Sequence, residues 1–456
     1  MSHLKAQKID ATTGKLMKAI VLYAVPLILG TLVQNCFNAI DLIVLGNMAD
    51  SNAVASVGAT STIVSLLVNS FIGIVGGSKI ILAHLFGARN SAQIKKTVDT
   101  AMLTAVGLGI IVAVIGVPLA PKILQITNCP EDCFAGAVEY MRIYVAAAPA
   151  ILLYNFGSAV LTSSGDSQRP LYYIIISGLV NAVLNIVLCL ILPQKVVAVA
   201  VSTAVSQLVG ALLVIQRLCR MEGDGKIVLQ RLRFDSGALK QIMIQGIPLA
   251  INSAIYPFAN LQIQSAINTF GVSAIAGNSA CGTLEGVPGA FSGSFASTAT
   301  VFIGQNLGAG KKKRAKKSFL YCLVTSCAVG IVFGVCIYLT GRFWLSFFLP
   351  NDPVGIDYGM IRMFYVLLFY PVACANGVLS AAIQTHGYAV YTSICTIVCV
   401  CGFRLIWMWF LYPLFESFAM LMACFLVSWL LLLGCNIVGY FIFCHRQKED
   451  TAAMPG

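Results

Sequence analysis

Long apolar stretches separated by short polar breaks dominate the pattern of this 456-residue chain. At about 1.5 Å per residue in a helix, each stretch is long enough to cross a bilayer core about 30 Å thick. The pattern therefore predicts an all-α polytopic membrane protein with twelve transmembrane helices. The predicted spans are 17–45, 54–85, 97–118, 136–162, 170–192, 195–217, 239–269, 277–305, 317–340, 358–383, 388–412 and 418–443.

Composition and charge agree with a multi-pass membrane protein. Hydrophobic residues make up 58% of the chain and charged residues only 10%, and the mean hydropathy is +0.87. The net charge of +12 would suit a nucleic-acid partner, but its distribution argues against one. Of the 29 Lys and Arg residues, 22 lie at the termini, in alternate gaps between spans, or within two residues of those gaps. The other gaps and their edges hold only Lys122, Lys195 and Arg342. This positive-inside pattern predicts that both termini are cytoplasmic.

The same features address localisation and processing. The chain is predicted to lie in the cell membrane, and more specifically in a bacterial inner membrane. Residues 1–15 are polar, so no cleavable signal peptide is expected. The lipid bilayer is therefore a predicted partner, and nucleic acid is not.

The two halves of the chain echo each other. Pro26 matches Pro248 at an offset of 222, and Arg142 matches Arg362 at an offset of 220. We predict an N-terminal six-helix bundle, a cytoplasmic linker, a C-terminal six-helix bundle and a cytoplasmic tail. Because each half holds an even number of spans, the repeats should be related by an axis along the membrane normal, with the substrate path between them. The predicted boundaries are 1–217, 218–238, 239–445 and 446–456.

Several short motifs, each weak by itself, follow one another along the chain. They include GAVEYMRIY at 136–144, YNFG at 154–157, QNLGAG at 305–310 and the apolar stretch around Asp41 that ends at Gly46. With these motifs the chain, from residue 14 to about residue 443, resembles the multidrug and toxic compound extrusion (MATE) family. The resemblance implies two pseudo-symmetric six-helix bundles around a central cavity. It also implies export of small organic, often cationic compounds in exchange for Na⁺ or H⁺ by alternating access, by a monomer without a cofactor other than Na⁺.

A polar stripe in the first span carries the main candidate site. Gln34, Asn38 and Asp41 are spaced by four and three residues, which places them on one helical face. A carboxylate at membrane depth costs roughly 3 kcal/mol on insertion scales, so it normally faces a lined interior. Asp41 is therefore predicted to couple to an ion or proton, and hydration at the outer end of the helix is the alternative. Many family members have an acidic residue that matches Asp41.

Two further spans of the first half carry polar side chains. Asn181 and Asn185 lie four residues apart on one face of the fifth span. The family often has Asp at the second of these positions, and Asn185 cannot titrate, which puts a two-carboxylate proton site in doubt. Na⁺ ligation and interhelical hydrogen bonding both remain open for this pair. Asn69 in the second span is a candidate for the substrate cavity, although the small residues beside it favour close helix packing.

The second half has a matching polar edge. Tyr256, Asn260 and Gln264 follow one another at intervals of four residues in the seventh span and are predicted to line the substrate cavity. Glu285 lies near the start of the eighth span. Relatives often have a glutamate at this place, so an ion-coupling role and simple hydration at the external rim are both open.

Basic residues within the spans need polar partners. Arg404 is predicted to contribute to the cavity and to require an anionic or carbonyl partner at membrane depth. Arg142 and Arg362 are interpreted as side chains that extend to the outer interface. Lys79 lies near a cytoplasmic span end and is interpreted as structural.

Export has two competing interpretations, a flippase and an enzyme. A lipid-linked oligosaccharide flippase of the same superfamily is the alternative, but such flippases usually have more basic residues in their cavity. An enzyme is not predicted, because no nucleotide-binding loop and no nucleophile with a placed base occur in the sequence. Cys129 and Cys133, in a predicted external loop, could form a disulfide or a metal pair; an incidental pair is favoured, since two ligands do not make a metal site.

Overall fold

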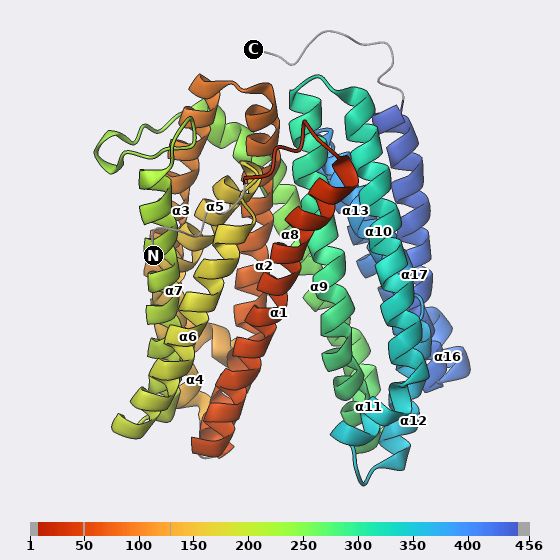
Figure 1. Cartoon of the computed structure of the whole chain (residues 1–456). Coiled ribbons are helices and arrows are strands. Elements are labelled where there is room, and N and C mark those ends of the chain that lie inside the picture. The colour runs from red at the N-terminus through yellow and green to blue at the C-terminus, as the bar shows by residue number, and fades with distance from the viewer. Residues whose placement is uncertain (1–7, 49–50, 128, 446–456) are drawn as a thin grey trace. The chain divides into compact units, whose positions relative to one another are not determined.

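The computed structural model describes the backbone of residues 8–48, 51–127 and 129–445, and within these ranges every regular element is helical (Figure 1). Some side chains in these ranges are not described, including that of Asn38. The all-α fold class is confirmed. The long helices are α1 (Leu16–Met48), α2 (Ser51–Ala88), α3 (Ser91–Ile126), α4 (Glu131–Ala146), α5 (Ala148–Ser163), α6 (Gln168–Ile191), α7 (Lys195–Arg220), α8 (Ser236–Asn268), α9 (Val272–Gly308), α10 (Lys312–Leu339), α12 (Pro353–Arg362), α13 (Tyr370–Thr385) and α17 (Phe418–Gly439).

The remaining helical segments are short. They are the 3₁₀ turn η1 (Leu229–Arg231), the helices α11 (Gly341–Phe348), α14 (Ala389–Thr396), α15 (Phe403–Ile406) and α16 (Tyr412–Phe415), and the π-helical turns η2 (Met363–Leu367), η3 (Ile397–Gly402), η4 (Trp407–Leu411) and η5 (Tyr440–His445). The π-helical turn η2 follows α12 and leads to α13, so that Pro353–Thr385 forms one membrane-length segment. The turns η3 and η4 join α14, α15 and α16 in the same way into the segment Ala389–Phe415.

The number of membrane-length segments agrees with the sequence pattern. Among the described residues, ten segments are long and apolar enough to cross a membrane, and α4 with α5 forms an eleventh. Helix α9 has 37 residues and is long enough, but its many Gly, Ser and Thr residues make it less apolar. With α9 the total is the predicted twelve.

One predicted span has a different shape from the one expected. The stretch 136–162 is not a single straight helix, because α4 and α5 meet at Ala147 with a bend of 44°. Pro149 lies in the first turn of α5, where its missing N–H group and fixed φ are tolerated, so a new helix begins here.

The chain folds as two compact units. The N-terminal unit consists of Val21–Ala250 with the described part of the first fourteen residues, and the C-terminal unit consists of the chain from Ile251 with Lys15–Ile20. The division therefore falls inside α8. The six-helix bundle boundaries given by the sequence, at 217 and 239, stay a prediction.

Close backbone contact holds the first part of α8, up to Ala250, in the N-terminal unit. A Cβ atom added at Gly77 of α2 would lie 2.4 Å from the amide nitrogen of Gly246, and one at Gly73 would lie 2.3 Å from Ala250 Cα. Glycine is needed at both positions because the two backbones touch, which is the usual way that membrane helices associate through small residues. At the start of α8, Asp235 Oδ1 accepts a hydrogen bond of 2.8 Å from the Ala238 amide. This bond lowers the pKa of the Asp235 carboxyl group.

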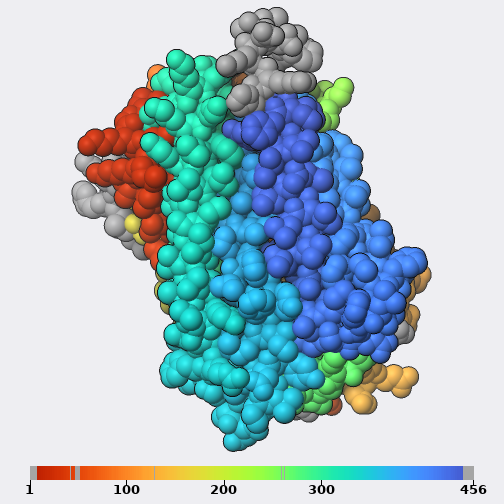
Figure 2. Space-filling view, turned by 90° about the vertical axis from the view of Figure 1, so that its right-hand side faces the viewer, coloured from red at the N-terminus to blue at the C-terminus, as the bar shows by residue number. Residues whose placement is uncertain are grey.

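The C-terminal unit presents an apolar outer face. Figure 2 shows this face, along which α10 and α17 run. Both helices expose large apolar side chains, as expected for a surface in contact with lipid. On α10 these are Leu320, Val324, Ile331, Val332, Val335 and Leu339, and on α17 they are Leu430, Leu431, Ile437 and Val438.

Candidate functional site

Helices α1 and α6 approach closely near Asp41. A Cβ atom at Gly178 of α6 would lie 1.9 Å from the Phe37 ring of α1, so a larger residue does not fit there. Phe37 precedes Asp41 by about one helical turn, and Gly178 precedes Asn181 by nearly one turn. This contact places the polar residues of the two helices side by side.

The three polar side chains form one hydrogen-bonded group. Asn185 Nδ2 donates to Asp41 Oδ1 and, at 3.4 Å, to Asn181 Oδ1. Asn181 Nδ2 in turn lies 3.4 Å from Thr203 Oγ1 of α7. Both asparagines are buried, with 5% of Asn181 and none of Asn185 exposed. The structure therefore brings together three of the predicted coupling residues and adds Thr203, which the sequence did not single out.

One oxygen atom of this group has no hydrogen-bond partner among the described residues. Asn185 Oδ1 is buried and accepts no bond from the described part of the chain. A buried acceptor without a donor is unfavourable, and a cation would satisfy it. With the Asp41 carboxylate and the Asn181 and Thr203 oxygens nearby, the oxygen-rich ligand set suits Na⁺, and the carboxylate alone suits a proton.

The other residues predicted for the first half are not part of this group. Gln34 is exposed on α1, and the side chain of Asn38 lies outside the described residues. Asn69 is half-buried on α2. No described hydrogen bond joins Gln34 or Asn69 to Asp41, and the roles of all three stay predictions.

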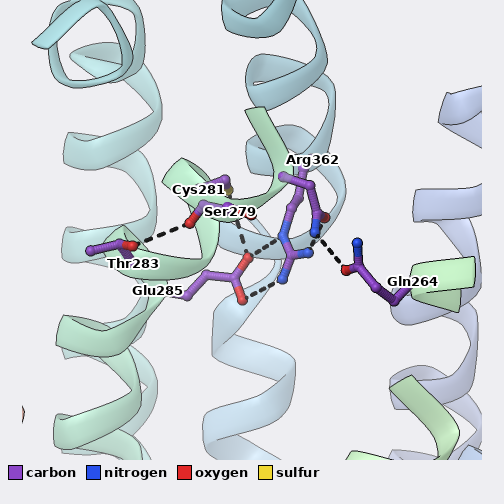
Figure 3. Close-up of polar contacts among 7 residues, drawn as sticks. Gln264, Ser279, Cys281, Thr283, Glu285 and Arg362 are labelled. Carbon is purple, nitrogen blue, oxygen red and sulfur yellow. Dashed lines mark hydrogen bonds and ion pairs between the residues drawn. The ribbon is translucent and has the colours of Figure 1, made fainter. Parts of the chain in front are cut away.

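A buried ion pair lies in the C-terminal unit (Figure 3). Arg362 of α12 donates from Nε to Glu285 Oε1 at 2.6 Å and from Nη2 to Glu285 Oε2 at 2.9 Å. The side chains of Arg362 and Glu285 are 12% and 19% exposed. The interpretation that Arg362 extends to the outer interface is therefore wrong: a carboxylate within reach neutralises it inside the unit. Arg142, its counterpart in the first half, is exposed.

Amide side chains extend this ion pair towards α8. Arg362 Nη1 donates to Asn278 Oδ1, and Asn278 Nδ2 donates to Gln264 Oε1 at 3.2 Å. Gln264 Nε2 then donates to Asn268 Oδ1 at 3.0 Å. Figure 3 shows Gln264 pointing towards this network from α8. The amide of Gln264 is thus engaged with α9, and its predicted place in the substrate cavity stays a prediction.

Arg404 lies at a second buried position of the C-terminal unit, in α15. It is 3% exposed, its Nη1 donates to Asn260 Oδ1 at 2.8 Å, and its Nε donates to Ser428 Oγ at 3.2 Å. Its guanidinium carbon is 4.4 Å from the centre of the Phe425 ring. The predicted need for an anionic or carbonyl partner is met by the amide carbonyl of Asn260. An arginine at membrane depth costs roughly 3 kcal/mol on insertion scales, which neutral partners offset only in part.

A cavity of about 440 Å³ lies within the C-terminal unit. Its lining is uncharged and combines aromatic rings with amide and hydroxyl groups, which is typical of a pocket for a small organic molecule. Tyr256 is a predicted cavity residue that lines it. The polar and aromatic lining residues include Asn252, Tyr256, Tyr370, Asn376, Gln384 and Trp429.

Cys129 and Cys133 also lie close together, with 3.7 Å between their sulfur atoms, and both are free thiols. Burial and the neighbouring Cys133 thiol raise the pKa of the Cys129 thiol. Among the described residues, no group of three or more His, Cys, Asp and Glu side chains could hold a metal ion, and the incidental nature of this pair of thiols stays a prediction.

Sequence reasoning missed several partners in these groups. Asn278 precedes Glu285 by seven residues, two helical turns on one face of α9, and this spacing could have identified it. Thr203 and Phe425 carry no such signal, because common residues in apolar spans do not show which neighbour they meet.

Comparisons with known proteins agree with the architecture. The MatE family model matches residues 26–187 and 248–410, one segment in each half. The probable multidrug resistance protein YoeA of Bacillus subtilis is 25% identical over 457 residues, with 95% of each chain covered. A protein named FAD transporter from Shewanella oneidensis is 25% identical over 372 residues, with 79% of each chain covered.

A solved structure described as the outward-facing conformation of a multidrug resistance MATE family transporter of the MOP superfamily has the same fold. It superposes with a TM-score of 0.86 at 19% identity, over 97% of this chain and 99% of that one.

Proposed function

Because the chain belongs to the MatE family, we propose that it is a secondary-active antiporter that exports small organic compounds, many of them cationic, in exchange for H⁺ or Na⁺. The chain is a multi-pass membrane protein with twelve membrane-length segments, counting α9 and the bent α4–α5 pair. The observation that carries the proposal is the group of half-buried Asp41 with buried Asn181 and Asn185, in which Asn185 Oδ1 accepts no hydrogen bond from any described residue. The flippase alternative is not favoured, because Glu285 neutralises one of the few basic residues within the spans.

The chemistry proposed for Asp41 is competition for one negative charge. As a carboxylate it attracts a cationic substrate, and once protonated it does not. A bound Na⁺ would supply the same neutralisation, held by the Asp41 carboxylate and Asn185 Oδ1. Ion and substrate therefore compete for this carboxylate, and the competition is a coupling free energy between the two ligands. The free energy released by ion entry then drives substrate exit. Asn185 holds the carboxylate in place through its hydrogen bond.

We further propose that both termini are cytoplasmic and that the membrane is a bacterial inner membrane. The support is the asymmetric distribution of the 29 basic residues, which favours cytoplasmic termini. In this orientation substrate leaves the cell as ions enter. Exchange of access between the two sides follows the alternating-access scheme of transporters built from repeats.

The proposal is tested with Asp41→Asn in proteoliposomes, since this change keeps size and hydrogen bonding but removes the charge. Efflux of ethidium is measured under an imposed Na⁺ gradient at constant pH and, separately, under a pH gradient without Na⁺. The wild-type protein should transport under one of these gradients, and Asp41→Asn should lose that gradient-driven component. The gradient that works identifies the ion.

A matched control is Asp357→Asn, the same chemical change at an exposed carboxylate that pairs with Arg342 at 2.8 Å. It should transport at the wild-type rate. All variants are first compared by size-exclusion chromatography, so that loss of fold is not mistaken for loss of coupling. Wild-type transport by folded Asp41→Asn would show that another residue carries the coupling.

A further inference from the structure

The buried charges around Phe425 in the C-terminal unit do not balance. The guanidinium carbons of Arg362 and Arg404 lie 5.6 Å and 4.4 Å from the centre of the same ring. Glu285 neutralises Arg362 with two hydrogen bonds. Among the described residues no carboxylate pairs with Arg404, so this cluster carries one net positive charge.

The partners of Arg404 leave much of its hydrogen-bonding capacity unused. A guanidinium has five N–H donors in a planar fork that matches a carboxylate. Only two described bonds use this fork, one to the Asn260 carbonyl and one to the Ser428 hydroxyl. Buried cations are normally paired, and neutral acceptors replace only part of the lost hydration. The site therefore favours an anionic group that would take the place of Asn260.

Both hydrogen-bond partners of Arg404 lie on helices that line the uncharged cavity, α8 and α17. Asn260, which binds Arg404, follows the cavity residue Tyr256 by four residues, or about 6 Å along α8. Ser428, the other partner of Arg404, directly precedes the cavity residue Trp429. Along α8, the cavity residue Tyr256 and the residue that binds Arg404 are thus about one helical turn apart.

We propose that the C-terminal unit binds aromatic organic carboxylates, with the ring system in the cavity against Tyr256 and Trp429 and the carboxylate paired with Arg404. This assignment rests on the proposed export function and narrows its substrate class. It adds anionic and zwitterionic compounds to the cations that Asp41 favours. Arginine and carboxylate form two parallel charge-assisted hydrogen bonds, which gives the site selectivity for the charged group over its ester.

The test uses two dyes that differ only at this group. Rhodamine 110 has a free carboxylate, and rhodamine 123 is its methyl ester. Binding to the purified full-length protein is measured by fluorescence anisotropy in dodecyl maltoside, an uncharged detergent, so that no anionic lipid competes. The wild-type protein should bind rhodamine 110 about tenfold more tightly than rhodamine 123, as expected for one desolvated ion pair.

Two variants remove the proposed contact in different ways. Arg404→Gln removes the cation. Asn260→Asp keeps Arg404 and places a carboxylate where the amide oxygen already lies, 2.8 Å from Nη1. Both variants should lower the affinity for rhodamine 110 about tenfold and leave that for rhodamine 123 within about twofold. Arg142→Gln, a matched change at an exposed arginine, should alter neither affinity.

The outcomes separate this assignment from the export proposal. If Arg404→Gln does not fold, Asn260→Asp alone decides, because it adds a compensating charge to the cluster. Unchanged selectivity between the two dyes in folded Asn260→Asp would overturn the assignment, and Arg404 would then be structural. The binding assay uses no ion gradient, so absence of gradient-driven ethidium export would refute the proposed function without affecting this measurement.

Discussion

Glu285 offers the sharpest test of the distinction between a structural and a coupling carboxylate. Glu285→Gln removes the negative charge and leaves Arg362, whose side chain is 12% exposed, as a buried cation without a counter-ion. Loss of one partner from a buried ion pair typically costs about 3–5 kcal/mol, more than a single hydrogen bond is worth. At about 1.4 kcal/mol per factor of ten, the ratio of folded to unfolded protein should fall by roughly a hundredfold or more.

The assay is unfolding by SDS in mixed micelles, followed by tryptophan fluorescence. Glu285→Gln should unfold at a clearly lower SDS fraction than the wild-type protein. The double variant Glu285→Gln with Arg362→Gln contains no unpaired charge, so it should recover much of the loss. With the single variant Arg362→Gln measured as well, the double-mutant cycle gives the interaction energy of the pair.

Two results would refute this reasoning. If Glu285→Gln is as stable as the wild-type protein, the pair does not contribute to the fold as its burial implies. If Glu285→Gln is stable but has lost gradient-driven ethidium efflux, whereas Asp41→Asn transports normally, Glu285 carries the coupling and the assignment to Asp41 is wrong.

Two further predictions concern packing and topology. Gly77→Ala should destabilise the N-terminal unit by about 1–3 kcal/mol, because its Cβ would lie 2.4 Å from the amide nitrogen of Gly246. Gly58→Ala on the same helix, where a Cβ would have no atom within 4 Å, should be neutral or slightly stabilising. Equal unfolding of the two variants in SDS would contradict this reasoning. Lys313 is an exposed residue of α10, and a single cysteine can replace it in a cysteine-free variant. This cysteine should react with an impermeant thiol reagent only from the cytoplasmic side. Labelling from outside would overturn the proposed orientation.

The sequence by itself determined the span pattern, the repeat and the family. In a bilayer each helix satisfies its own backbone hydrogen bonds, so the position of a span depends only on its local residues. Hydropathy therefore gave twelve segments, and their spacing gave the similarity of the two halves. The bend between α4 and α5 was not predicted, because Pro149 is tolerated both within a span and at the start of a new helix.

Only the tertiary structure decided which polar groups meet. Asp41 and Asn185 are 144 residues apart, as are Asn260 and Arg404. A polar stripe shows which face of a span turns inward, but not which distant helix that face meets. That choice depends on backbone fit, such as Gly178 against the Phe37 ring, and it is made between helices that are distant in the chain. The sequence thus identified the residues that could carry charge or bind an ion, and helix packing assigned each of them its partner.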